Sequence, residues 1–252
     1  RPEQGSLLGP GYSNDEIRAY LDSQAAIYTY YDSEQATVDE IAALIAAEKV
    51  VGHVSGRMEF GPRALGARSI LGDARSTKMQ QTMNLKIKFR ESFRPFAPAV
   101  LREHVDEFFE MRPNEDSPYM LLVAPVRETK LVRHDEPAAQ GFDKLKQVRS
   151  AVPAVTHVDG SERVQTIDEE RNPRFYRILQ AFKAKTGSPV LINTSFNVRG
   201  EPIVNTPEDA YRCFMHTNMD VLVLENCILL KEDQPEARSI DLEAYLAEFS
   251  LD

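Results

Sequence analysis

Short apolar segments alternate with segments of helical spacing along almost the whole chain of 252 residues, and this alternation restricts the fold more than any other feature. Runs rich in apolar residues indicate strands at 50–54, 96–101, 119–126, 154–158, 164–167, 189–193, 221–224 and 227–230. Only Glu225 and Asn226 separate the last two runs, which indicates a hairpin. Strands that alternate with helices in this way predict an α/β fold with a mixed sheet.

Capping residues followed by apolar positions three and four apart mark the expected helix starts. We expect helices at 13–22, 37–49, 76–88, 102–110, 172–187, 206–216 and 242–249, with caps at Ser13, Thr37, Ser76 or Thr77, Asn172 and Thr206. Gly187 is the expected residue after the end of the fifth helix. Residues 128–150 are polar, mixed in charge and without a clear period, so they predict a mobile insertion or long loop.

The charge of the chain is unevenly distributed. The net charge is −9, which argues against general nucleic-acid binding. Residues 57–102 nevertheless hold ten Lys and Arg against three acidic residues. A basic region in an acidic protein indicates a local anion site, although a solvated basic helix face at 78–88 would also explain part of it.

Cysteine usage and hydropathy indicate a cytoplasmic protein. Cys213 and Cys227 lie in apolar patterns and are expected to be buried thiols in a reducing compartment. There is no run of 18 apolar residues, no secretory signal pattern and no close grouping of Cys and His for a metal. The chain starts at Arg1 rather than Met, so we expect an excised domain or a trimmed terminus.

Four segments carry polar side chains at predicted strand ends or turns, where α/β sheets usually bind ligands. In segment 56–66, Arg63 follows Pro62 between two glycines, and its guanidinium offers a planar set of donors suited to phosphate. Segments 93–98, 156–165 and 193–202 add further arginines, hydroxyls and amides. Ordinary turns with surface arginines would explain the same residues, so composition alone leaves both interpretations open. The chain has no Walker A motif and no Gly-x-Ser-x-Gly, so catalysis on ATP would depend on positioning and on fixed arginines.

At these segments the sequence resembles the C-terminal domain of the ATP-dependent O-carbamoyltransferases, a family that includes tobramycin and cephalosporin carbamoyltransferases and nodulation protein U. The shared motifs are GRMEFGPRALG at 56–66, RSIL at 68–71, FRPFAP at 93–98, VTHVDG at 155–160, RVQT at 163–166, NTSFN at 193–197 and RGEP at 199–202. The resemblance implies a YrdC-like domain over residues 1–252, with an open twisted mixed sheet flanked by helices. It also implies a longer enzyme, whose actin/hexokinase-like N-terminal domain is absent here.

The resemblance further implies that this domain binds carbamoyl phosphate and ATP and forms carbamoyl adenylate, which a small-molecule hydroxyl then attacks in the N-terminal domain. The implied ligand-binding residues are Arg63, Arg94, Arg163, Asn197 and Arg199, followed by a second group of Arg57, His157, Asn193, Thr194 and Ser195. No catalytic residue and no protein metal ligand is assigned. Mg²⁺ is expected on the ATP, held mostly by phosphates and water, and iron is expected only in the missing domain.

Two other functions stay open. The domain could be a non-catalytic docking module that shapes the active site of another subunit. It could also be an RNA-binding YrdC-like module, although the charge of −9 and the lack of interleaved aromatic residues argue against RNA.

Overall fold

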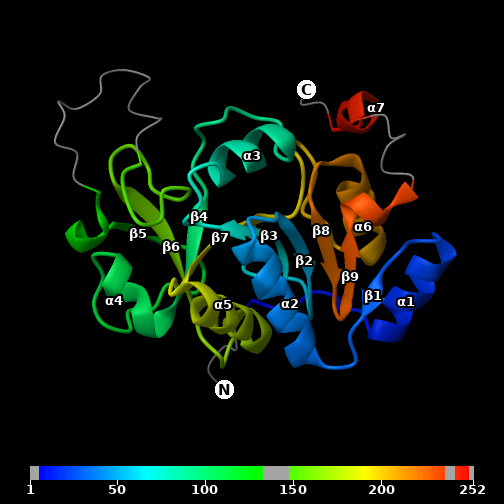
Figure 1. Ribbon diagram of the computed structural model, residues 1–252, viewed down its shortest axis with the longest axis horizontal. Coiled ribbons are helices and arrows are strands. Elements are labelled where there is room, and N and C mark those ends of the chain that lie inside the picture. The colour runs from blue at the N-terminus through cyan, green and yellow to red at the C-terminus, as the bar shows by residue number, and fades with distance from the viewer. Residues whose placement is uncertain (1–5, 133–147, 236–241, 250–252) are drawn as a thin grey trace.

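The computed structural model describes residues 6–132, 148–235 and 242–249, and within them nine strands form one sheet (Figure 1). The strands are β1 (Thr29–Tyr30), β2 (Val51–Val54), β3 (Arg68–Asp73), β4 (Ala97–Leu101), β5 (Leu122–Pro125), β6 (Ser161–Ile167), β7 (Val190–Ser195), β8 (Val221–Leu224) and β9 (Cys227–Leu230). Their order is β1-β9-β8-β2-β3-β7-β4-β6-β5. The pairs β2–β8 and β4–β6 are parallel and the others antiparallel. The predicted α/β fold with an open mixed sheet is confirmed, and it is consistent with a YrdC-like architecture.

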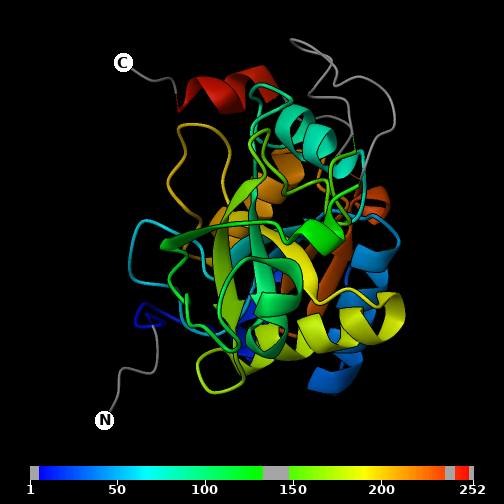
Figure 2. The ribbon, with the colours of Figure 1, turned by 90° about the vertical axis from the view of Figure 1, so that its left-hand side faces the viewer.

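Helices cover both faces of this sheet. They are α1 (Asn14–Ser23), α2 (Glu34–Ala46), α3 (Met79–Lys86), α4 (Val105–Phe108), α5 (Pro173–Thr186), α6 (Pro207–His216) and α7 (Leu242–Ala247). On one face, buried side chains of α2 and α5 pack together against the sheet, and Figure 2 shows these two helices side by side. On the other face, α1, α3 and α6 contribute to a second apolar cluster. The sheet is therefore buried on both sides, which explains its apolar central strands.

Three predicted helix caps and one predicted helix end lie where the sequence places them. Ser13 and Thr206 each form a capping box at the start of α1 and α6. The Asn172 side chain accepts a hydrogen bond at the start of α5, and Gly187 ends that helix with a left-handed φ of 78°. The predicted buried cysteines are also confirmed, because Cys213 and Cys227 are both free and buried.

Two predicted helix starts are wrong. Helix α2 begins one turn earlier than expected, because the Ser33 side chain caps it, and Thr37 lies inside the helix with its hydroxyl donating to the Ser33 carbonyl oxygen. Helix α3 begins at Met79 without a side-chain cap, since the Ser76 hydroxyl accepts from the nearby Lys78 N–H instead.

Residues 154–158 form turns rather than the predicted strand. The Val155 N–H donates to the Val152 carbonyl oxygen, and the Thr156 hydroxyl donates to the same oxygen, so local bonds replace a strand pairing. The predicted helix at 102–110 is a short 3₁₀ turn followed by α4, which ends at Phe108. The expected insertion at 128–150 falls largely on residues 133–147, which lie outside the described residues.

No helix in the described part of the chain is both long and apolar enough to cross a membrane.

Candidate functional site

The centre of the sheet brings three distant loops to one edge. Strand β7 lies between β3 and β4 and runs antiparallel to both. The end of β7 at Ser195 therefore lies beside the beginnings of β3 and β4. The loop before β3 carries Arg63, and the loop before β4 contains residues 93–96. Both loops therefore lie beside the end of β7.

A cavity of about 200 Å³ opens at this edge. Prolines and apolar side chains form part of its wall, and its polar lining consists of Arg63, Arg90, Arg163, Asn193, Thr194 and Ser195. Five of these six residues were predicted from the sequence as ligand-binding candidates. Arg90 was not among them, although it belongs to the basic region and lies three residues before the start of the 93–98 motif.

Buried hydrogen bonds fix the loop that carries Arg63. The Glu59 side chain is 5% exposed, and its Oε1 accepts from the backbone N–H groups of Leu65, Ala67 and Arg68 at 2.7, 2.6 and 3.1 Å. The Arg68 side chain is fully buried and donates to four backbone carbonyl oxygens, those of Pro10, Gly56, Ala67 and Asn205. Because the loop is tied at both ends, Arg63 is held at the cavity instead of moving freely in solvent.

Two amide side chains join this loop to the sheet. Asn193 Nδ2 donates to Gln165 Oε1 at 2.6 Å and to the Ala64 carbonyl oxygen at 3.2 Å. Gln165 Nε2 in turn donates to the Leu65 carbonyl oxygen at 3.0 Å. These bonds set the orientation of the Asn193 amide and leave its Oδ1, which is buried, without a hydrogen-bond partner among the described residues.

Positive charges converge on the cavity. The pKa of Arg163 is lowered first by burial and second by the charge of Arg63. Burial also lowers the pKa of Arg90 to about 10, with the charge of Arg94 as the second cause. Within the described residues neither Arg63 nor Arg163 has an ion-pair partner, and the buried Nε of Arg163 has no acceptor. Like charges without counter-ions, together with buried polar atoms that lack partners, are typical of a site that binds an anion.

Arg94 and Arg199 are exposed and lie outside the described lining of this cavity. Arg94 is adjacent in sequence to Pro95 and Phe96, which line the cavity, and its charge acts on Arg90. Arg199 lies on the loop that follows β7.

The side chains of Asn197 and Arg57 form hydrogen bonds to other residues of the protein. Asn197 Oδ1 accepts from Ser195 Oγ and Lys88 Nζ, and its Nδ2 donates to the Glu201 carbonyl oxygen. Arg57 donates from Nε to the Gly9 carbonyl oxygen and from Nη2 to that of Leu8, so it holds the N-terminal segment.

His157 lies at a second, wider cavity of about 540 Å³, which shares Pro95 with the first. Its backbone N–H donates to Oε1 of the buried Glu162 at 2.6 Å, and its Nε2 lies 3.5 Å from Glu162 Oε2. Burial is the main cause that lowers the pKa of His157 and also the main cause that raises that of Glu162 to about 9. The two cavities are neighbours, since the charge of Arg163 also acts on His157.

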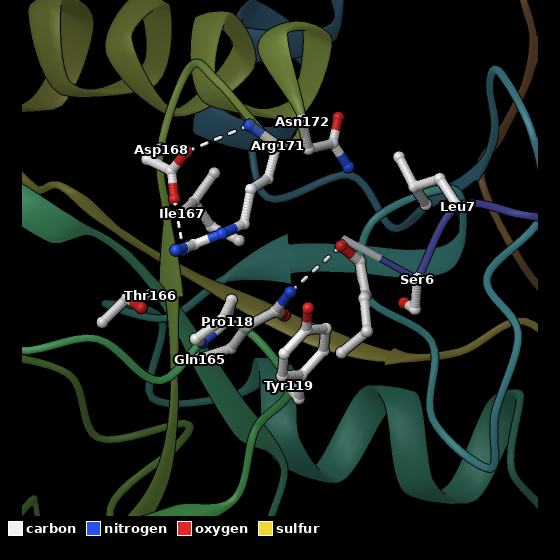
Figure 3. A pocket seen from close by; sticks show the side chains of 11 residues that line it. Ser6, Leu7, Pro118, Tyr119, Gln165, Thr166, Ile167, Asp168, Arg171 and Asn172 are labelled. Carbon is white, nitrogen blue, oxygen red and sulfur yellow. Dashed lines mark hydrogen bonds and ion pairs between the residues drawn. The ribbon is translucent and has the colours of Figure 1, made fainter. Parts of the chain in front are cut away.

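A third cavity, of about 30 Å³, is lined by Tyr119, Gln165 and Arg171, among others (Figure 3). Its arginine, Arg171, donates to Asp168 at 2.7 Å and to Asp116 at 2.5 Å. The charge of Arg171 is therefore neutralised within the protein, and the described lining of this small cavity lacks the unpaired arginines of the first. Within the described residues no group of three His, Cys, Asp or Glu could hold a metal ion.

The fold and the first cavity define an α/β domain with an arginine-lined pocket. Comparison with known proteins identifies the family of this domain, because the family model of the carbamoyltransferase C-terminus matches residues 42–231. The chain belongs to this family.

Three relatives illustrate the range of the family. An uncharacterized protein of Synechocystis is 55% identical over 98% of this chain, which corresponds to 40% of that protein. Nodulation protein NolNO of Sinorhizobium fredii is 42% identical over 75% of the chain and 25% of its own length. The 3'-hydroxymethylcephem-O-carbamoyltransferase of Amycolatopsis lactamdurans is 39% identical over 68% of the chain and 28% of its own length. The chain thus spans 25–40% of the length of these curated relatives.

Proposed function

We propose that the arginine-lined cavity binds carbamoyl phosphate and ATP and forms carbamoyl adenylate, as one half of an enzyme that carbamoylates a hydroxyl of a small molecule. The observation that carries this proposal is the convergence of Arg63, Arg90 and Arg163 on one cavity in a member of the carbamoyltransferase C-terminus family. The name of one relative, a cephem O-carbamoyltransferase, supports transfer to a hydroxyl oxygen.

The polar groups of the cavity match both ends of carbamoyl phosphate. The guanidinium groups of Arg63 and Arg163 are donors for phosphate oxygens. The Oδ1 atom of Asn193 is an acceptor, which a carbamoyl N–H requires. A cavity with donors alone would suit inorganic phosphate equally well, so the Asn193 oxygen favours the carbamoyl compound.

Fixed positive charge also addresses the main physical obstacle to the reaction. Carbamoyl phosphate and ATP are both anionic, and two unit charges about 4 Å apart repel by roughly 4 kcal/mol at an effective dielectric constant near 20. In a balanced reaction, water cleaves carbamoyl phosphate to carbamate and phosphate, and the carbamate oxygen then attacks the α-phosphorus of ATP and displaces pyrophosphate. Arginines held by the protein offset the charge repulsion and stabilise the negative charge on both leaving groups. Mg²⁺ on the ATP, held by phosphates and water, belongs to this proposal.

The proposal extends to the whole enzyme. We place the acceptor site, and any iron, in the part of the longer protein that precedes this domain. A cytoplasmic location, where ATP is available and thiols stay reduced, completes the proposal.

Replacing Arg63 by Ala tests the assignment of the cavity. We expect the variant to bind carbamoyl phosphate at least about 30-fold more weakly, because it loses a charged hydrogen bond to the anion. Calorimetry on the whole chain measures the affinity, and Arg112→Ala is the matched control because the Arg112 side chain is 85% exposed. Equal affinity of Arg63→Ala and the unaltered chain would remove the assignment.

Release of pyrophosphate from labelled ATP in the presence of carbamoyl phosphate tests the chemistry. Release that requires both compounds supports adenylate formation. Tight binding of both compounds without release would support a docking module instead.

A further inference from the structure

The loop between β7 and α6 borders the anion cavity and is built around Asn197. Its Nδ2 donates to the Glu201 carbonyl oxygen at 2.6 Å, which closes the loop. Its Oδ1 accepts from Ser195 Oγ at 2.7 Å, and Ser195 lines the cavity. Any shift of this loop would therefore move the wall of the cavity.

Lys88 supports the loop from the side of α3. The residue is 4% exposed, and its ammonium group donates to Asn197 Oδ1 at 2.8 Å and to the Asn197 carbonyl oxygen at 2.9 Å. It also donates to the Ser195 carbonyl oxygen at 2.5 Å. One side of the loop is thus held by a residue within the matched family region.

The opposite side of the loop is held from outside that region. Glu201 is 7% exposed, and its side-chain Oε2 accepts from the Val198 N–H at 2.8 Å. Its Oε1 accepts from the hydroxyl of Tyr245 on α7 at 2.6 Å. The family match ends at residue 231, whereas α7 begins at Leu242.

The segment that follows α7 also contacts the loop backbone directly. Gly200 has a φ of +84°, and a Cβ atom built there would lie 2.3 Å from the carbonyl oxygen of Phe249. A side chain at position 200 would therefore require a backbone to shift. The contact leaves room only for glycine, so the segment after α7 rests on the loop itself.

Contacts with α6 hold α7 in this place (Figure 1). The Tyr245 ring stacks on the His216 ring with 4.3 Å between centroids. Arg212 forms an ion pair with Glu248 at 3.0 Å, and its guanidinium lies over the rings of Tyr245 and Phe249. Because Tyr245 is itself 2% exposed, its hydroxyl has a fixed direction toward Glu201.

We propose that α7 is a positioning element of the anion site, in which Tyr245 holds Glu201 and thereby keeps the loop 196–201 in the conformation that binds ligand. The inference rests on the proposed function, since it concerns the same cavity. Tyr245 is a positioning residue, because it acts on the ligand only through Glu201 and the loop.

Tyr245→Phe removes the hydroxyl and keeps the ring that packs on α6. The matched control is Tyr28→Phe, which removes a tyrosine–carboxylate hydrogen bond of 2.8 Å to Asp22, far along the sheet from the cavity. We expect Tyr245→Phe to weaken carbamoyl phosphate binding by about tenfold, as an unsatisfied buried acceptor would predict. We also expect the Val198 amide to exchange its hydrogen about tenfold faster, because Glu201 no longer holds a fixed position. Tyr28→Phe should change neither quantity.

A double-mutant cycle with Glu201→Gln tests the route of the effect. If Tyr245 acts through Glu201, the double variant should bind no more weakly than the weaker of the two single variants. Additive losses would overturn the inference, as would unchanged Val198 exchange in Tyr245→Phe, or faster exchange with unchanged affinity. If the unaltered chain bound neither carbamoyl phosphate nor ATP, the proposed function would fail, while Val198 exchange would still decide whether α7 holds the loop.

Discussion

Glu59→Ala should destabilise the protein and the anion site together, because one carboxylate oxygen organises the whole Arg63 loop. Its Oε1 accepts three backbone N–H groups, and two of the donor residues, Ala67 and Arg68, are buried. Each buried N–H left without an acceptor costs about 1–3 kcal/mol, so the free energy of unfolding should fall by about 2–6 kcal/mol. Glu59→Gln keeps an acceptor without its charge and should lose about half as much, since charge-assisted bonds are roughly twice as strong as neutral ones.

Urea denaturation followed by circular dichroism measures these losses, and calorimetry measures the affinity for carbamoyl phosphate. Glu170→Ala serves as the control because Glu170 is exposed, and it should change neither quantity. The order of stability should be control, then Gln, then Ala. An Ala variant with the urea midpoint of the control would show that the carboxylate does not organise the loop, and the account of how Arg63 is positioned would be refuted.

Two further predictions concern the fold. Glu162 has a pKa of about 9 in the folded state, against 4.5 for an ordinary carboxyl group. Between these two pH values the folded state therefore binds more protons than the unfolded state. The free energy of unfolding should therefore fall as pH rises from about 5 to 9, by up to about 1.4 kcal/mol per pH unit, and Glu162→Gln should flatten this slope in urea titrations at several pH values. Gly66 has a φ of +115°, and an added Cβ would lie 2.4 Å from the Phe175 ring, so Gly66→Ala should cost about 2–5 kcal/mol. Gly160→Ala, with a φ of +76° but open space around the position, should cost only about 1 kcal/mol, and equal thermal midpoints would count against the packing argument.

Features set by neighbouring residues were predictable from the sequence. Ser13, Asn172 and Thr206 cap their helices through bonds to residues three positions away. Thr37 shows the limit of such patterns, because Ser33 offers an equally good cap one turn earlier, although the buried face of α2 begins only at Thr37.

Features set by distant residues were not predictable. Strand β3 begins with Arg68 and ends with Asp73, both untypical of a central strand. The Arg68 side chain is accommodated by carbonyl oxygens as far along the chain as Asn205. Arg90 was missed for a similar reason, since its place at the cavity depends on the position of β7 between β3 and β4 and not on any local motif.

The antiparallel pairing of β7 with both β3 and β4 has a further consequence for the abundance of the protein in the cell. The cavity is lined by residues 62–64, 95–97 and 193–195, together with Arg90, Met120 and Arg163, so it exists only while β7 is paired on both sides. A ligand bound in the cavity would then oppose global unfolding, and a ligand concentration of a hundred times Kd would raise the free energy of unfolding by about 2.7 kcal/mol. Proteases degrade unfolded molecules, and ligand binding lowers the unfolded fraction. The abundance of this protein in a cell should therefore rise with the concentration of its ligand.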